Sequence, residues 1–141
     1  MSDLNHTSDT ASLGFVYINT DPSDPQIGEV VRYDQFVQKL FKKQDVYKMT
    51  SHALRGVCTE AGELTDAFKK HLDYEKELNI ENVIEELGDL EFYMQVVRNL
   101  YNIPQQVVLQ YNAEKLGKRY KGLAYSDLAA HLRADKNGNG S

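Results

Sequence analysis

Hydrophobic residues recur at intervals of three and four along the chain from Tyr33 onward, the spacing of one face of an α-helix. The pattern predicts helices over about 33–44, 46–72, 80–101, 104–120 and 127–133. No internal repeat and no alternation of strands with helices is visible. The sequence therefore predicts an all-α fold, a bundle of four or five helices.

Two of the predicted helices have long apolar stripes, joined by the polar connector 73–79. Asn79 is a favourable N-cap for the second of them. Pro104 suits the first turn of the next helix, and Ser126 caps the last. The two stripes consist of Leu54, Val57, Cys58, Ala61, Leu64, Phe68 and Leu72, and of Ile80, Val83, Ile84, Leu87, Leu90, Met94 and Val97.

The chain ends differ from this helical middle. Residues 1–12 are small and polar, 15–18 are β-prone, and D-P-S-D-P at 21–25 blocks a helix. We expect an irregular N-terminal arm over 1–32, partly disordered or in contact with another subunit. The helical domain then spans 33–133, and 134–141 form a flexible tail.

Composition and charge narrow the functional classes. The 141 residues carry a net charge of −5, which argues against binding to nucleic-acid polymers or acidic membranes. No signal-peptide pattern and no apolar run of about 18 residues appears, so we expect a cytoplasmic protein. The single cysteine, Cys58, excludes an intrachain disulfide, and its apolar stripe predicts a buried core thiol rather than a nucleophile.

Four carboxylates form the main chemical pattern. Glu60 and Glu63 lie three apart on one helix, as Glu86 and Asp89 do on the next. If the helices form an antiparallel hairpin around 73–79, the two pairs lie at about the same level, at 1.5 Å rise per residue. Converging carboxylates repel one another, and a bound cation relieves this repulsion. All-oxygen ligation suits Mg²⁺ or Mn²⁺ rather than zinc, and a di-iron bundle would need Glu-x-x-His, which the chain lacks.

Small residues accompany these carboxylates. Ala53, Gly56 and Ala67 lie on the same flank, where they leave room for a ligand or a close neighbour. Gly62 and Gly88 separate the acidic residues of each pair. The alternative interpretation is a solvated acidic face, which is common on surface helices.

At these residues the chain resembles the MazG-like all-α nucleoside triphosphate pyrophosphohydrolases. The resemblance rests on E-x-x-E at 60–63, a gap of 22 residues and E-x-x-D at 86–89, followed by Tyr93. Downstream, N-A-E-K-L-G-K-R-Y at 112–120 resembles the Asn, Lys and Arg-Tyr helix of that family. The resemblance to the family covers about 36–121. It implies Mg²⁺-dependent hydrolysis of a nucleoside triphosphate at the α-phosphorus, giving a nucleoside monophosphate and pyrophosphate. It also implies that the protein is a homodimer or homotetramer.

The resemblance also implies roles for individual residues. Glu63, besides being a metal ligand, would orient or deprotonate the attacking water. Lys115 and Arg119 would contact phosphates, although a solvated basic stripe fits the same spacing. Tyr93 would contact the substrate, although such an aromatic also suits core packing. The full predicted set is Glu60, Glu63, Glu86 and Asp89 for the metal, and Tyr93, Asn112, Lys115, Arg119 and Tyr120 for the substrate.

Other functions fit parts of the same pattern. The chain has no tryptophan, which places a pyrimidine-specific enzyme in doubt without establishing a purine substrate. A dUTP- or phosphoribosyl-ATP-directed relative is a second interpretation. A non-catalytic helical interaction module, whose carboxylates are only a solvated face, is a third. Phe36, Phe41, Gln44 and Tyr47 are candidates for contacting the base and equally for the core.

Overall fold

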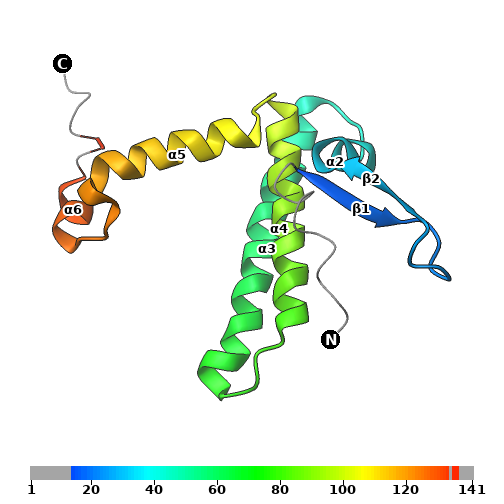
Figure 1. Ribbon diagram of the computed structural model, residues 1–141, viewed down its shortest axis with the longest axis horizontal. Helices are drawn as coiled ribbons and strands as arrows, with labels where there is room; N and C mark the ends of the chain where they lie inside the picture. The colour runs from blue at the N-terminus through cyan, green and yellow to red at the C-terminus, as the bar shows by residue number, and fades with distance from the viewer. Residues whose placement is uncertain (1–13, 134, 137–141) are drawn as a thin grey trace. The chain divides into compact units, whose positions relative to one another are not determined.

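The computed structural model describes residues 14–133 and 135–136. These residues form five α-helices, a short 3-10 turn and one two-stranded sheet, so the predicted all-α class is confirmed (Figure 1). The predicted polar segment 1–12 and most of the tail 134–141 lie outside the described residues. The chain divides into two compact units, up to Tyr101 and from Asn102, and each is described by itself.

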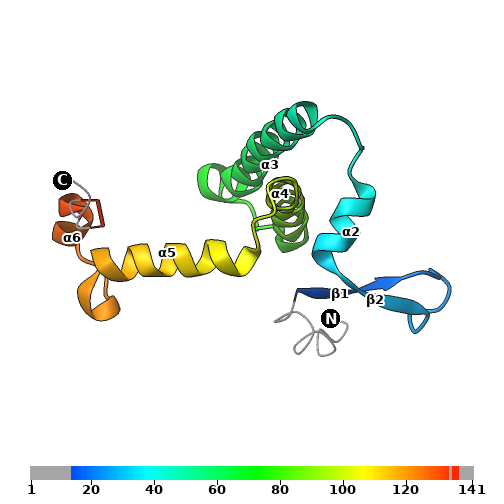
Figure 2. The same cartoon turned by 90° about the horizontal axis from the view of Figure 1, so that it is seen from above.

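The centre of the first unit is an antiparallel hairpin of α3 (Val46–Tyr74) and α4 (Ile80–Leu100), which pack side by side (Figures 1 and 2). Asp45 caps α3 by accepting a hydrogen bond from the backbone N–H of Lys48 at 2.9 Å. Asn79 caps α4 in the same way, as predicted, accepting from Asn82 at 3.1 Å. The predicted hairpin therefore forms, with helix limits close to those expected.

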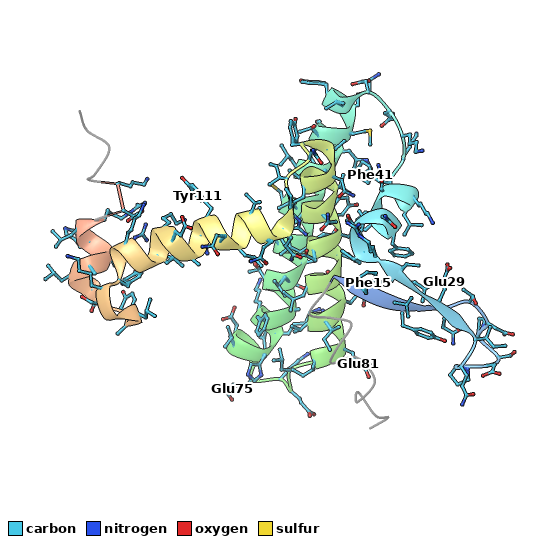
Figure 3. All side chains as sticks on the ribbon, turned by 45° about the horizontal axis from the view of Figure 1, so that its top comes forward. Phe15, Glu29, Phe41, Glu75, Glu81 and Tyr111 are labelled. Carbon is cyan, nitrogen blue, oxygen red and sulfur yellow. The ribbon has the colours of Figure 1, made fainter. Side chains whose placement is uncertain are left out.

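Helix α2 (Tyr33–Leu40) is shorter than the predicted 33–44, because the chain turns to an extended conformation at Phe41. Phe41 is labelled in Figure 3. Its ring packs against the rings of His52 and Phe92, with centroid distances of 4.9 and 6.3 Å. Burying this ring requires the chain to leave the helix. Asn99 of α4 donates a hydrogen bond to the backbone oxygen of Asp34 at 2.8 Å, which ties α2 to α4.

The buried core is small. In the part of the chain that the structure describes, the buried hydrophobic side chains are those of Val37, Phe41, Ala53, Val83 and Val96.

Several predictions of burial are wrong. Cys58 is exposed, although its stripe predicted a core thiol. The buried residues of α3 are Ala53 and Gly56, which lie beside the predicted apolar stripe rather than on it. The exposed residues of the two predicted stripes include Leu54 and Leu72 on α3, and Ile80, Ile84 and Leu87 on α4.

The described part of the N-terminal arm is a β-hairpin of β1 (Phe15–Asn19) and β2 (Gly28–Arg32). The strands are antiparallel, with Phe15 opposite Arg32 and Asn19 opposite Gly28. The β-prone run at 15–18 thus lies in a strand, whereas the sequence predicted an irregular arm here and gave no indication of β2. Its G-E-V-V-R sequence is too short to show a clear alternation on its own.

The second unit contains α5 (Gln105–Arg119), the 3-10 turn η1 (Lys121–Leu123) and α6 (Asp127–Leu132). Gly122 has φ of 80°, a left-handed conformation that glycine adopts without strain, and it lies at the predicted break. Ser126 caps α6 as predicted, accepting from Ala129 at 3.2 Å. Among the described residues, no helix combines the length and apolar character needed to cross a membrane.

Candidate metal centre

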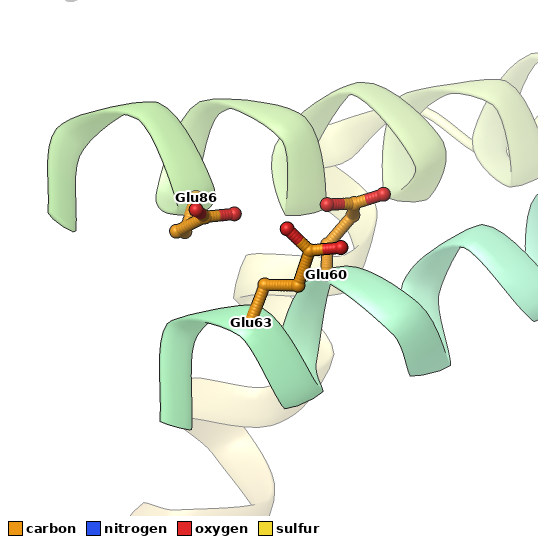
Figure 4. A group of neighbouring side chains, drawn as sticks. All are labelled: Glu60, Glu63 and Glu86. Atoms are coloured by element: carbon orange, nitrogen blue, oxygen red, sulfur yellow. The ribbon is translucent and has the colours of Figure 1, made fainter. Parts of the chain in front are cut away.

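Three glutamates from the two helices of the hairpin point toward one another. Glu60 and Glu63 come from α3 and Glu86 comes from α4 (Figure 4). One carboxylate oxygen from each of the three lies within 4.8 Å of the others. The antiparallel pairing brings residues 23 positions apart in the sequence to one level. We call these three residues the carboxylate cluster.

Asp89, the fourth predicted ligand, does not belong to this cluster. Its side chain is exposed on α4, one turn after Glu86. Its charge nevertheless acts on the cluster, since it contributes to raising the pKa of both Glu60 and Glu86. The structure therefore brings together three of the four carboxylates that the sequence selected.

The electrostatics of the cluster disfavour three simultaneous negative charges. Burial is the largest cause that raises the pKa of Glu86, which is only 9% exposed, and the charge of Glu63 is the next. Burial and then Glu63 raise the pKa of Glu60 as well. Within the described ranges, no lysine or arginine forms an ion pair with any of the three. A bound proton or cation would relieve this repulsion.

The chemistry of the donors fits a hard divalent cation. All three groups offer carboxylate oxygens, which Mg²⁺ and Mn²⁺ prefer, and no thiol or imidazole belongs to the cluster. Glu63 is exposed, so a ligand can reach the cluster from solvent. Mg²⁺ commonly binds through one or two protein carboxylates and keeps the other positions for water and phosphate oxygens.

The small residues beside the cluster make room for an aromatic ring. Gly56 is buried, and a Cβ at its position would lie 2.4 Å from Cδ1 of Tyr93. The Tyr93 ring makes T-shaped contacts with Phe41 and Phe92, at centroid distances of 6.5 and 5.4 Å. The space over Gly56 is thus filled by a close neighbour from α4, and the structure gives Tyr93 a packing role.

The remaining predicted residues belong to the second unit. Arg119 forms a two-pronged ion pair with Asp135, at 2.7 Å from Nε to Oδ1 and 2.9 Å from Nη2 to Oδ2. The side chain of Asp135 is 2% exposed, and hydrogen bonding to Arg119 lowers its pKa to about 2. The Arg119 guanidinium, predicted for phosphate, is therefore engaged by a carboxylate.

Three further residues predicted to bind the substrate, Tyr120, Asn112 and Lys115, also belong to the second unit. The guanidinium carbon of Arg119 lies 5.9 Å from the centre of the Tyr120 ring, a cation–π distance. Asn112 is exposed, and Lys115 is half-buried. Asp135 was not among the predicted site residues. Its sequence context, an acidic residue shortly after a basic helix, was the one hint of a pair with Arg119.

Comparison of the chain with protein-family models, with characterised proteins and with solved structures finds no match. We therefore infer function from the residues themselves, from the geometry of the carboxylate cluster and from the resemblance in motif spacing. Fold class alone does not specify function, because helical bundles support many unrelated activities.

Proposed function

We propose that this protein is a Mg²⁺-dependent nucleoside triphosphate pyrophosphohydrolase that releases pyrophosphate and a nucleoside monophosphate. The observation that carries the proposal is the convergence of Glu60, Glu63 and Glu86 from two helices. The motif spacing of the MazG-like family supports it, because that family carries its metal ligands at the corresponding positions. Mn²⁺ is the expected substitute for Mg²⁺.

The residues of the cluster take different parts in this proposal. Glu60 and the buried Glu86 hold the cation, since neither forms an ion pair with a lysine or arginine of the described residues. The exposed Glu63 holds the cation and also orients or deprotonates the attacking water. Asp89 joins as a fourth donor from the adjacent turn of α4. When bound, the ion would neutralise part of the negative charge of the triphosphate, which otherwise opposes attack by water.

Phosphate contacts in the proposal come from the basic helix α5. Lys115 offers a compact positive charge and Asn112 an amide donor on the same helix face. Arg119 takes part only if phosphate oxygens replace Asp135, because its guanidinium fork is already filled. We further propose that the working form is a homodimer or homotetramer.

The direct test is incubation of the purified chain with a panel of dNTPs and NTPs and Mg²⁺, with pyrophosphate release as the readout. We expect release from at least one nucleotide and loss of release when EDTA removes the metal. Glu63→Gln should lower the rate at least about a hundredfold, as expected for loss of a catalytic base. Glu77→Gln, in the exposed connector outside the cluster, is the matched control.

Absence of pyrophosphate from every nucleotide, with folded protein and Mg²⁺ or Mn²⁺ present, would contradict the enzyme proposal. Including dUTP and phosphoribosyl-ATP in the same panel distinguishes the more specialised relatives from a general enzyme.

A second candidate function is a non-catalytic interaction module, and the exposed apolar residues of α3 and α4 favour it. It predicts that Glu63→Ala and Asp89→Ala leave the affinity for Mg²⁺ or Mn²⁺ unchanged in calorimetric titration. The enzyme proposal predicts that Glu63→Ala weakens this affinity at least about tenfold, since even residues behind the ligands have effects of that size.

A further inference from the structure

One carboxylate of the second unit lies between two guanidinium groups. Both oxygens of Asp135 accept hydrogen bonds from Arg119, and its Oδ1 also lies 4.0 Å from Nε of Arg133. Arg133 is the C-cap of α6, so α5 and the end of α6 each supply one positive charge. We call Arg119 and Arg133 the arginine pair.

The charges of this group do not balance. Asp135 supplies one negative charge against two positive charges, and Arg119 engages both of its oxygens. The distance of 4.0 Å from Arg133 is too long for a hydrogen bond, and the side chain of Arg133 is 45% exposed. The arginine pair therefore carries one positive charge more than its carboxylate neutralises.

A terminal phosphate group matches the arginine pair better than a carboxylate does. It offers three acceptor oxygens and a charge of about −1.5 to −2, whereas a carboxylate has two oxygens and a single charge. Two phosphate oxygens fit the planar fork of a guanidinium in the same way as a carboxylate. The third oxygen and the additional charge remain for the second arginine.

Two aromatic rings support the Arg119 guanidinium independently of Asp135. Its central carbon lies 5.9 Å from the centre of the Tyr120 ring, and that ring contacts Tyr125 at a centroid distance of 5.6 Å. The hydroxyl of Tyr125 donates a hydrogen bond to Asp127 at 2.8 Å. The guanidinium therefore remains positioned when another anion takes the place of the Asp135 carboxylate.

The segment that carries Asp135 is held mainly by polar contacts. In α5, η1 and α6 no residue is buried, and Leu123 and Leu128 are 89% and 67% exposed. A backbone hydrogen bond of 2.8 Å from the N–H of Lys136 to the oxygen of Arg133 closes the turn after α6. Little apolar burial opposes an opening of this turn, and segments of this kind open locally while the rest of a protein stays folded.

We propose that the arginine pair is a binding site for a phosphate group, and that Asp135 is an internal competitor that fills the site when no ligand is bound. The choice of a triphosphate as the ligand rests on the proposed function, because the substrate of that reaction carries the phosphates. Binding displaces the Asp135 carboxylate and opens the turn after α6. Asp135 thereby lowers the affinity for the ligand, since apparent affinity falls with the fraction of molecules whose site is free.

The first test measures the binding of inorganic triphosphate to the full chain by calorimetric titration. EDTA is present, so neither a metal ion nor hydrolysis contributes. Asp135→Asn keeps the size of the side chain and removes its charge, and it should bind triphosphate at least about tenfold more tightly than wild type, because its site is free in most molecules. A carboxylate with only a structural role would leave the affinity unchanged or weaken it when replaced.

The matched control for this variant is Asp127→Asn, which removes one negative charge from the same unit. The carboxylate of Asp127 accepts from Tyr125 and does not fill the arginine pair. Its removal should change the affinity for triphosphate by no more than about twofold at physiological salt, because a charge outside the site is screened.

Loss of either guanidinium should remove the gain in affinity. In the Asp135→Asn background, Arg119→Gln and Arg133→Gln should each weaken triphosphate binding at least about tenfold, since hydrogen bonds to charged groups commonly contribute this much. Lys118→Gln, at an exposed lysine of α5, is the matched control for loss of a positive charge, and it should change the affinity by no more than about twofold.

Hydrogen exchange gives a measurement on the unmutated protein. The Lys136 amide donates to Arg133 only while the turn is closed. Saturating triphosphate should therefore accelerate exchange of this amide at least about fivefold, because the turn opens when Asp135 is displaced. The Ala129 amide, which donates to the Ser126 side chain at the start of α6, is the internal control and should not accelerate.

Two results would overturn the inference. The first is an Asp135→Asn variant, folded by circular dichroism, that binds triphosphate no more tightly than wild type. The second is a Lys136 amide whose exchange triphosphate leaves unchanged or slows, because Asp135 would then stay in place.

Failure of the proposed function has a different signature. If Asp135→Asn gains affinity for triphosphate but no nucleotide yields pyrophosphate, the phosphate site stands and the hydrolytic reaction is wrong. If the wild type releases pyrophosphate but Asp135→Asn gains no affinity, the reaction stands and the internal competitor is wrong.

Discussion

At the scale of single residues, the two glycines of α3 near the cluster have opposite environments. A Cβ on Gly56 would lie 2.4–2.5 Å from ring atoms of Tyr93, whose ring is held by Phe41 and Phe92. A Cβ on Gly62 would meet no atom within 4 Å. One glycine is therefore required by a close approach, and the other is not.

This difference predicts opposite effects of the same substitution. Gly56→Ala should lower the free energy of unfolding by about 1–3 kcal/mol, because the Tyr93 ring must move. Gly62→Ala should raise it by up to about 1 kcal/mol, because alanine is the better helix former. Urea unfolding followed by circular dichroism measures both. A destabilised Gly62→Ala would reveal a close neighbour at that position.

Asp135 is the other residue whose environment gives a prediction. Its pKa of about 2 lies below the ordinary value of 3.8, so its ionised form stabilises the folded chain above pH 3.8. This contribution is lost as the pH falls from 3.8 through 2. Asp135→Asn should therefore lower the melting temperature at pH 7, and its difference from wild type should shrink below pH 3.8.

The control for this prediction is Asp66→Asn, which removes an exposed pair with Lys70. Exposed pairs contribute little, so its melting temperature at pH 7 should stay close to that of wild type. An unchanged melting temperature for Asp135→Asn as well would show that its pair with Arg119 does not stabilise the fold.

At the scale of elements, the start of α4 determines the level at which Glu86 faces α3. Asn79 is the N-cap, and its side chain accepts from the backbone of Asn82. Asn79→Ala should lower the free energy of unfolding by about 1 kcal/mol, whereas Asn79→Ser should retain most of it. Chemical unfolding measures both, and equal losses for the two variants would mean that the cap hydrogen bond is not the cause.

Helix α2 depends on tertiary contacts more than on its own sequence. It has eight residues, and isolated helices of that length are marginal in water. Val37 is fully buried, and Asn99 holds the backbone of Asp34. The packing of Val37 and Phe41 against α3 and α4 therefore decides where this helix ends.

At the scale of the whole molecule, pH and metal should act together on stability. The pKa values of Glu60 and Glu86 are raised above 4.5, so without metal their ionisation destabilises the fold. This penalty is absent below pH 4.5 and grows as the pH rises through the raised values. Under the proposed function, a bound cation would compensate these charges and remove the penalty.

We therefore expect Mg²⁺ to raise the melting temperature more at pH 7.5 than at pH 4.5. At about 100 times its Kd the ion adds about 2.7 kcal/mol to the free energy of unfolding. Glu86→Gln should raise the melting temperature of the metal-free protein at pH 7.5 and abolish the Mg²⁺ effect. An equal effect of Mg²⁺ on wild type and on Glu86→Gln would contradict a metal site in the carboxylate cluster.

The sequence alone determined the helical class, the α3–α4 hairpin with its Asn79 cap, and the three glutamates of the carboxylate cluster. These features depend on local periodicity, capping and rise per residue, which act between near neighbours in the chain. The tertiary structure decided that Cys58 and Leu54 are exposed, that Tyr93 covers Gly56 and that Asp135 engages Arg119. Each of these outcomes depends on how one element rotates or folds against another, and helical spacing does not specify that rotation.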